Sequence, residues 1–177
     1  MNKIVIAASI ASLFAAFSAS AADYVWTGNT QYAEDWFDVY NWTVDGEIPS
    51  TYPQEGDRAI FDKDAKLNVG TEMRVGELVV NANLIHRRDS WLTVGKISGT
   101  GKILLQNRGR LRNANGVEVD CPVDVEVSNP DSTACSNHGA MPFIQGNNAD
   151  FRLSGRLLGD GHVFFTMSGY KGVRLAG

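Results

Sequence analysis

The sequence predicts an all-β protein whose chain winds into a β-solenoid of a few stacked coils. Apolar and polar residues alternate in several stretches, which is the period of a strand with one buried face. Helical patterns are nearly absent after residue 22, the best being the short stretch 32–37. A set of glycines recurs further along the chain at one constant offset, and recurrence at a fixed spacing is typical of stacked coils.

Residues 1–22 have the features of a signal peptide. A basic start containing Lys3 leads into an apolar run from residue 4 to 17, and small residues follow up to Ala22. The Ala19-x-Ala21 spacing suits signal peptidase. We therefore expect an exported protein, extracellular or at the cell surface, with the periplasm as the alternative. The run is shorter than the ~20 apolar residues that span a bilayer, and no later stretch is long enough, so no transmembrane segment is expected.

The charge balance argues against nucleic acid as a partner. The whole chain has a formal net charge of −4. Loss of the signal peptide removes Lys3 and leaves 15 of the 16 basic residues against all 20 acidic ones, for a mature charge of −5. An acidic surface repels phosphates rather than neutralising them.

Residues 23–62 form an aromatic-rich segment. Its tryptophans and tyrosines are Tyr24, Trp26, Tyr32, Trp36, Tyr40, Trp42 and Tyr52. We expect these rings to form an N-terminal cap over one end of the solenoid, where the apolar core would otherwise meet water. The alternative is a platform on which Trp26, Trp36 and Trp42 stack against the faces of sugar rings.

Residues 63–177 are expected to hold the coils. The stretch 117–127 is the clearest, because five valines and Cys121 share one face while acidic residues and Pro122 share the other. Since proline cannot donate to a strand ladder, this stretch is one half-buried strand or two strands bent at Pro122. Further short strands, separated by Gly, Asn and Asp turns, are expected at residues 59–61, 66–69, 77–80, 91–94, 102–105, 151–153 and 162–167.

The recurring glycines favour a solenoid over other all-β folds. They form two matched sets, Gly95, Gly99 and Gly101, then Gly155, Gly159 and Gly161. We interpret them as structural turns at stacked corners, because each corner needs the same tight turn while the interior side chains can vary. With ~20–30 residues in a coil, the repeat would span two or three coils. The alternative is a β-sandwich whose hairpins use similar glycine turns.

This interpretation makes two structural predictions. At least one glycine in each of the pairs 99/101 and 159/161 should have a positive φ, which is uncommon for other residues. The two pairs should also lie along one edge of the molecule, separated by whole multiples of the ~4.8 Å strand spacing.

The second glycine set continues as Gly161-His162-Val163-Phe164-Phe165 and closes with Val173-Arg174-Leu175-Ala176-Gly177. This pattern resembles the repeat of bacterial autotransporter-associated β-strand proteins, which have a Gly-x-Gly-x-Leu start and a closing Thr-Leu-x-Leu-Ser-Gly. The opening, with Val25-Trp26-Thr27-Gly28 and Asn41-Trp42, is similar to the N-terminal segment of many such secreted proteins. The resemblance implies a right-handed parallel β-helix, secreted or displayed as a passenger, usually without catalytic residues. Because the chain is short for that family, we expect a fragment of a longer passenger or a small relative without its display module.

Cys121 and Cys135 are the only cysteines. In an exported chain such a pair usually forms a disulfide, which here closes a loop of about 15 residues and is worth ~3 kcal/mol. His138 would extend the pair to a partial metal set, but structural zinc takes four ligands and no fourth is evident. We therefore expect a disulfide and no metal site.

No catalytic set emerges from the sequence. Asp120, Asp124 and Glu126 share one strand face, as catalytic carboxylates do in polysaccharide-active β-helices. Residues two apart on a strand always reach that spacing, so a solvated charged face is the simpler interpretation. There is no nucleophile elbow or phosphate loop, and we expect neither an enzyme nor a cofactor. Three further carboxylates are Asp57, Asp62 and Asp64. Their oxygens would suit Ca²⁺, but the simpler interpretation is that they face water.

A local basic set stands out in this acidic protein. Arg108, Arg110 and Arg112 alternate with Gly109 and Leu111, so they should share one exposed face. An anionic glycan or lipopolysaccharide is one candidate contact for these arginines. The alternative is that they pair with acidic neighbours on the next coil.

Together these features predict a non-enzymatic, secreted or surface-displayed β-solenoid with a structural or adhesive role. Its partners would be surface glycans, or the surface of a host or neighbouring cell. An unpaired last coil would expose a strand edge, which tends to recruit another chain, so self-association through the open end is a further expectation. The alternative, based on the aromatic segment and on fold analogy, is a carbohydrate-binding or polysaccharide-active β-helix module.

Overall fold

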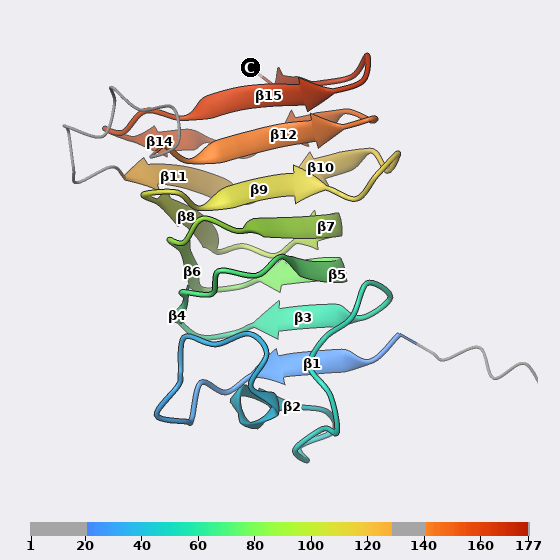
Figure 1. Cartoon of the computed structure of the whole chain (residues 1–177), viewed down its shortest axis with the longest axis vertical. Coiled ribbons are helices and arrows are strands. Elements are labelled where there is room, and N and C mark those ends of the chain that lie inside the picture. Colours follow the sequence, from blue (N-terminus) through green and yellow to red (C-terminus); the bar gives the residue numbers. More distant parts are fainter. Residues whose placement is uncertain (1–20, 129–140, 177) are drawn as a thin grey trace, which may run out of the picture.

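The computed structural model describes residues 21–128 and 141–176. Within these ranges the chain winds into a β-solenoid of about five turns (Figure 1). Among the described strand pairs only β1 and β2 run antiparallel. The predicted all-β solenoid is therefore confirmed, and the sandwich alternative is wrong because its hairpins would be antiparallel. No helix in the described part of the chain is long and apolar enough to cross a membrane.

The strands form three sheets that run along the solenoid axis (Figure 1). The eight-stranded sheet contains, in spatial order, β2 (Trp42–Thr43), β1 (Asp23–Trp26), β3 (Arg58–Phe61), β5 (Met73–Val80), β7 (Trp91–Ser98), β9 (Arg110–Asn113), β12 (Phe143–Asn147) and β15 (Phe164–Ser168). The five-stranded sheet contains β4 (Ala65–Leu67), β6 (Asn83–His86), β8 (Lys102–Gln106), β11 (Asp124–Ser128) and β14 (Leu157–Gly159). The three-stranded sheet contains β10 (Val119–Cys121), β13 (Phe151–Leu153) and β16 (Val173–Leu175).

In the central coils, the long strands β5 and β7 each extend over two faces of the solenoid. The alternation of buried and exposed residues in β5 and β7 breaks near Gly76 and Gly95, and β10 packs against β7. The two glycines are stacked, since a Cβ on Gly95 would lie 2.6 Å from the Gly76 carbonyl oxygen. Gly95 thus lies inside β7, where the strand passes from one face to the next, and it stacks on Gly76.

Equivalent residues of successive central coils are 19 positions apart in the sequence, and we call this spacing the coil step. Leu84 pairs with Ala65 of the coil below, and the neighbouring Asn83 N–H donates to Asp64, which lies 19 positions earlier in the chain. The same step leads from Leu84 to its next partner, Ile103. The coils beyond β8 are longer, and one of them contains the gap between the described ranges.

The two Gly-x-Gly pairs give a mixed result. Gly99 has φ +113° and Gly159 has φ +104°, so the predicted positive φ is confirmed in both pairs. The predicted stacking is wrong, because Gly99 lies over Val80, before β8, whereas Gly159 lies over Val127, at the end of β14. At each place a Cβ would come within 2.1 Å of the carbonyl oxygen below. Close backbone approach requires glycine at more than one kind of corner, so the constant offset between the two glycine sets is accidental.

The true stacked pair is Gly101 and Gly155. Both precede strands of the five-stranded sheet, and a Cβ on either would lie 2.1 Å from a carbonyl oxygen of the coil below, that of Ala82 or of Val123. Gly161 repeats the local hydrogen bond of Gly101 at another corner: the Gly161 N–H donates to the Val127 carbonyl at 3.3 Å, and the Gly101 N–H donates to the Val80 carbonyl at 2.8 Å. Gly101 and Gly155 are 54 residues apart rather than 60, because the two coils between them differ in length.

Inward side chains form continuous apolar columns. Met73, Leu92, Leu111 and Ile144 are fully buried one above another. This column ends on β15 at Phe165, which is 40% exposed. Burial of such columns, repeated from coil to coil, supplies the main stabilising free energy of the fold.

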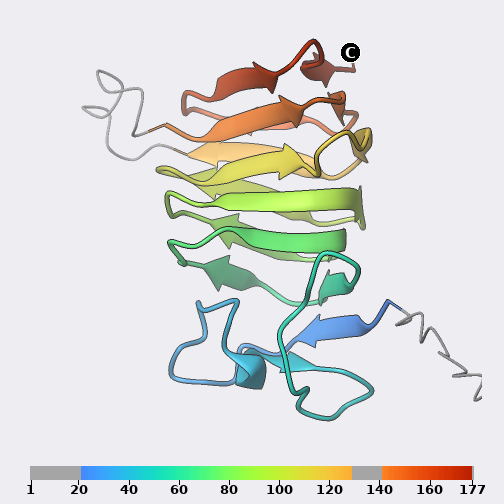
Figure 2. The same cartoon turned by 45° about the vertical axis from the view of Figure 1, so that its right-hand side comes forward.

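An aromatic cluster closes the opposite end, as expected. The ring of Trp42 packs edge-on against Trp26 at 4.8 Å and Trp36 at 4.9 Å between centroids, and Trp26 lies 5.5 Å from Phe61. The Trp42 Nε1–H donates to the Trp36 carbonyl at 2.8 Å. The segment between β1 and β3 wraps this end of the solenoid (Figure 2).

Local expectations held in part. The stretch 117–127 forms two strands that bend at Pro122, since β10 ends at Cys121 and β11 begins at Asp124. Residues 32–37 form turns, and the helical element among the described residues is instead the 3-10 helix η1 (Val39–Asn41). The Asp38 side chain places η1 there, because it accepts the Tyr40 N–H at 3.0 Å.

Candidate functional site

The three tryptophans proposed as a sugar platform are buried. Trp26, Trp36 and Trp42 are each at most 3% exposed, and each packs against other rings of the cluster. A sugar can stack only on an accessible ring. These tryptophans therefore act as the cap, and a glycan site must be sought elsewhere.

The basic set is paired with carboxylates. Asp89 lies 3.5 Å from Arg108 and 2.5 Å from Arg110, and Glu72 lies 2.7 Å from Arg112, between guanidinium nitrogen and carboxylate oxygen in each case. The sequence left this pairing open as the alternative to an anion contact. Carboxylates of earlier coils thus supply counter-charges to these arginines, so the arginines contribute to coil stacking, and an anion contact stays a prediction.

The acidic face of β10 and β11 is paired in the same way. The pairs are Asp120–Arg152, Asp124–Arg156 and Glu126–Lys102. Hydrogen bonds from the Arg156 side chain and backbone lower the pKa of the Asp124 carboxyl. A glycosidase general acid needs a raised pKa, so Asp124 is tuned in the opposite direction.

The carboxylates Asp57, Asp62 and Asp64 do not form a metal site in the described ranges. Those ranges contain no group of three or more His, Cys, Asp or Glu side chains that could hold a metal ion. Asp57 Oδ1 instead accepts the Ala22 N–H at 3.1 Å, and Asp64 Oδ1 accepts the Asn83 N–H at 3.0 Å. Asp62 accepts a hydrogen bond from the Asn81 side chain.

Cys121 forms no disulfide with another described residue, and its side chain is fully buried. Burial raises the pKa of this thiol to about 12, so it is not a nucleophile at neutral pH. Cys135 and His138 lie outside the described residues. No disulfide is observed within the described ranges, and the pairing of Cys121 with Cys135 stays a prediction.

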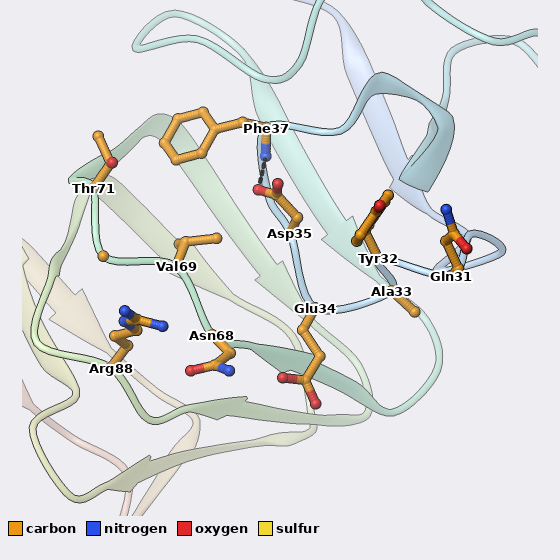
Figure 3. Close-up of a pocket in the computed structure, with 11 residues that line it drawn as sticks. Gln31, Tyr32, Ala33, Glu34, Asp35, Phe37, Asn68, Val69, Thr71 and Arg88 are labelled. Carbon is orange, nitrogen blue, oxygen red and sulfur yellow. Dashed lines mark hydrogen bonds between the residues drawn. The ribbon is translucent and has the colours of Figure 1, made fainter.

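A cleft of about 690 Å³ lies between the cap and the lowest coils (Figure 3). Residues 31–35 and Phe37 line one side, and residues 68–71 with Arg88 line the other. We call it the cap-loop cleft. Its volume falls within the ~300–1,000 Å³ of typical small-molecule sites.

Glu34 holds the cap loop, residues 31–37, against the coils. Its carboxylate lies 2.9 Å from the Lys66 ammonium and 3.0 Å from the Arg87 guanidinium, and its carbonyl accepts the Asn68 N–H at 3.0 Å. The hydrogen bond from Lys66, aided by the charge of Arg87, lowers the pKa of the Glu34 carboxyl. Two cations thus neutralise this carboxylate inside the cleft.

Asn41 sets the curvature of the same loop. It is fully buried, and its Nδ2 donates to the carbonyls of Tyr32 at 2.8 Å and Asp35 at 2.9 Å. Its Oδ1 accepts the Thr30 hydroxyl at 3.0 Å. The loop is therefore held from inside, and the cleft is preformed.

Arg88 is the unpaired cation of the cleft. Its side chain is exposed, and it makes no hydrogen bond or ion pair within the described residues, although the adjacent Arg87 is paired. Stacking of β6 on β4 brings Arg88, just after β6, beside Asn68 and Gly70, just after β4. Arg88 lies at the edge of the cleft in Figure 3.

Sequence patterns contain no signal for this site. Its lining comes from three separated segments that only the coil step brings together. Knowledge of that step would have placed Arg88 next to residues 68–70. Known proteins supply no template, since no family model, curated protein or solved structure matches the chain.

Proposed function

We propose that this protein is an exported, non-enzymatic β-solenoid with a structural or adhesive role at the cell surface, and that two copies join through the open end. The supporting observation is that the interior columns end in exposed apolar side chains on the last described coil. These side chains, between 39% and 66% exposed, are Leu157, Phe165, Met167 and Leu175.

The strands at this end also have no further partner strand among the described residues. β14, β15 and β16 are the last described strands of their sheets, and sheet edges recruit further strands. At the other end, β2 and the aromatic cap cover the corresponding apolar core. A contact between two open ends is closed and isologous, whereas a contact between unlike ends would build a filament. The capped end therefore favours a dimer.

Export and family membership belong to this proposal. The basic, apolar and small-residue sequence of residues 1–22 supports export. The solenoid fold supports the resemblance to autotransporter-associated β-strand proteins, as does the Trp-rich opening. A non-enzymatic role is supported by the ion pairs between coils, which occupy the carboxylates that a hydrolase would use.

Sedimentation velocity of the purified protein over a range of concentrations tests the assembly. We expect a monomer–dimer equilibrium that Phe165→Asp and Leu175→Asp each shift to monomer, because a buried unpaired charge is costly at the interface. Ile48→Asp is the matched control, since Ile48 is an exposed apolar residue at the capped end. A wild-type protein that stays monomeric at every concentration would rule out the assembly.

Carbohydrate binding is the second candidate function. The specific observation in its favour is the cap-loop cleft, which combines exposed aromatic, polar and cationic side chains in a preformed site. Binding and assembly use opposite ends of the solenoid, so a protein with an adhesive role can carry both.

A further inference from the structure

We propose that the cap-loop cleft binds a carboxylated sugar, such as a uronic acid unit of an acidic polysaccharide. This inference rests on the second proposed function, carbohydrate binding, and specifies its site and ligand class. Four features of the cleft carry it: an unpaired guanidinium, polar groups for sugar hydroxyls, an exposed ring, and a rigid loop.

Arg88 supplies the charge that would hold the carboxylate. Lys66 and Arg87 are occupied by Glu34, whereas Arg88 has no counter-ion among the described residues. A guanidinium binds a carboxylate through two parallel N–H···O bonds, which fixes orientation as well as affinity. The carboxylate would therefore lie on the coil side of the cleft, beside residues 68–71.

Polar groups around the cleft suit hydroxyls. Asp35 uses Oδ1 to accept the Phe37 N–H at 2.9 Å, which leaves Oδ2 without a partner among the described residues. The Thr71 hydroxyl is a second polar group of the lining, on the coil side of the cleft (Figure 3). Sugar hydroxyls both donate and accept, so they match a carboxylate oxygen and a threonine hydroxyl together.

Tyr32 supplies an aromatic surface. Its side chain is 64% exposed and lines the cleft. Phe37, the other ring in the lining, packs edge-on against Tyr52 at 4.9 Å and is held in place. A ring exposed next to hydrogen-bonding groups provides both the apolar and the polar part of sugar recognition.

A single carboxylate fits the charges better than a phosphate monoester, which carries close to two negative charges at neutral pH. Among the described residues that line the cleft, Arg88 is the free cation, and the carboxylates of Glu34 and Asp35 lie in the same lining. A dianion would require more than one unpaired cation and would be repelled by Asp35. Because Asn41 and Glu34 already hold the loop, little ordering free energy opposes binding.

Isothermal titration of the full protein with tri-galacturonate, compared with neutral galactotriose, tests the inference. We expect saturable 1:1 binding of the acidic sugar that weakens with added NaCl. Arg88→Gln should weaken it by about tenfold or more, because a charge-assisted pair is lost, and Tyr32→Ala by about fivefold. Arg88→Lys should give an intermediate affinity, because a lysine cannot form the bidentate pair.

Matched controls separate the cleft from the rest of the surface. Arg152 is an exposed arginine on β13, and Tyr40 is a tyrosine 60% exposed on η1, both outside the cleft lining. Arg152→Gln and Tyr40→Ala should leave the affinity unchanged. Near-ultraviolet circular dichroism of each variant confirms that the fold is retained.

The outcomes distinguish this inference from the function on which it rests. If both sugars bind equally and Arg88→Gln has no effect, the carboxylate specificity is wrong while carbohydrate binding stands. If neither sugar binds, this inference is overturned, and absence of binding to a panel of other glycans would then remove the carbohydrate function too. If Arg152→Gln weakens binding as much as Arg88→Gln, the site is not the cap-loop cleft.

Discussion

At the residue scale, buried polar side chains tie adjacent coils together at their corners. Asn113 is fully buried at the end of β9. Its Nδ2 donates to the Val117 carbonyl at 2.6 Å, and its Oδ1 accepts the Asn147 N–H at 2.6 Å. One amide thus closes its own corner and fixes the coil above. The corner depends on a donor and an acceptor in the same side chain.

Asn113→Asp should therefore destabilise the protein strongly. The change replaces the donor with an oxygen that faces a carbonyl, and we expect the free energy of unfolding to fall by about 2–3 kcal/mol. Asn115→Asp is the control, because Asn115 is exposed and its side-chain oxygen accepts from the Asn148 amide at 2.6 Å, a role that an aspartate oxygen can also fill. Urea unfolding of both variants measures the difference. Equal losses would show that the buried amide has no special role.

His86 makes stability depend on pH. It is fully buried between Leu67 and Leu105 in one column, and its Nε2–H donates to the Ser90 carbonyl at 2.8 Å. Burial lowers its pKa to about 4 from the ordinary value of 6.5. Below pH 6.5 the unfolded chain therefore takes up a proton that the folded protein does not.

Because of His86, the free energy of unfolding should fall by up to about 3 kcal/mol as the pH falls from 6.5 towards 4. We expect His86→Gln to flatten the fall in unfolding free energy between pH 7 and 4.5, measured by urea titration. His162 is exposed, so His162→Gln should leave the slope of the wild type intact. A His86→Gln slope equal to that of the wild type would contradict the assignment.

At the element scale, strands were predictable where one face alternates cleanly. Val119, Cys121, Val123 and Val125 are all buried, and the alternation in the sequence identified β10, β11 and the bend between them. β6 and β9 were not predicted, because each has a polar residue at an inward position, His86 or Asn113, which interrupts the apolar alternation. β1, β2, β12, β14 and β16 were also absent from the expected strands. The coil step was also hidden, because the members of one column, such as Leu67, His86 and Leu105, differ in chemistry.

The candidate site was less predictable than the strands. Aromatic residues near the N-terminus were visible as a group, but burial divides them: Trp36 is inside the cap and Tyr32 lines a cleft. Composition does not separate these two environments. Arg88 could not be assigned to the cleft without the coil step, because it is distant in sequence from the loop it faces.

Glycines at coil corners should tolerate no side chain. A Cβ on Gly101 would lie 2.1 Å from the Ala82 carbonyl oxygen, whereas a Cβ on Gly56 would meet nothing within 4 Å. Because the clash is with backbone, we expect Gly101→Ala to lower the unfolding free energy by about 3 kcal/mol or more. Gly56→Ala should change it by less than about 0.5 kcal/mol. Chemical denaturation of the two variants would expose a tolerant corner if the losses were alike.

At the scale of the whole molecule, the fixed coil step predicts which deletions preserve the fold. Removing residues 89–107 takes out one coil step, and so one complete central coil. β9 would then stack on β5, and β11 on β6, in the existing register. Removing residues 89–106 leaves one residue of that coil behind and exchanges the inward and outward faces of the strands beyond.

We therefore expect the full-coil deletion, 89–107, to keep β-type circular dichroism and a cooperative unfolding transition, and the shorter deletion, 89–106, to lose both. The full-coil deletion should still be less stable than the wild type, because one coil of buried apolar surface is gone. Equal behaviour of the two deletions would mean that the stacking register is not fixed.

The capped end and the open end also differ in when they form during folding. Each coil contacts mainly its immediate neighbours, so folding can start on the aromatic cap and add one coil after another. At every intermediate stage the newest coil presents an apolar edge like that of the last described coil. A chain folding beside a second copy therefore has two ways to cover that edge, its own next coil or its neighbour. Refolding yield should fall as the protein concentration rises, and it should recover when the chains are kept apart by dilution or immobilisation.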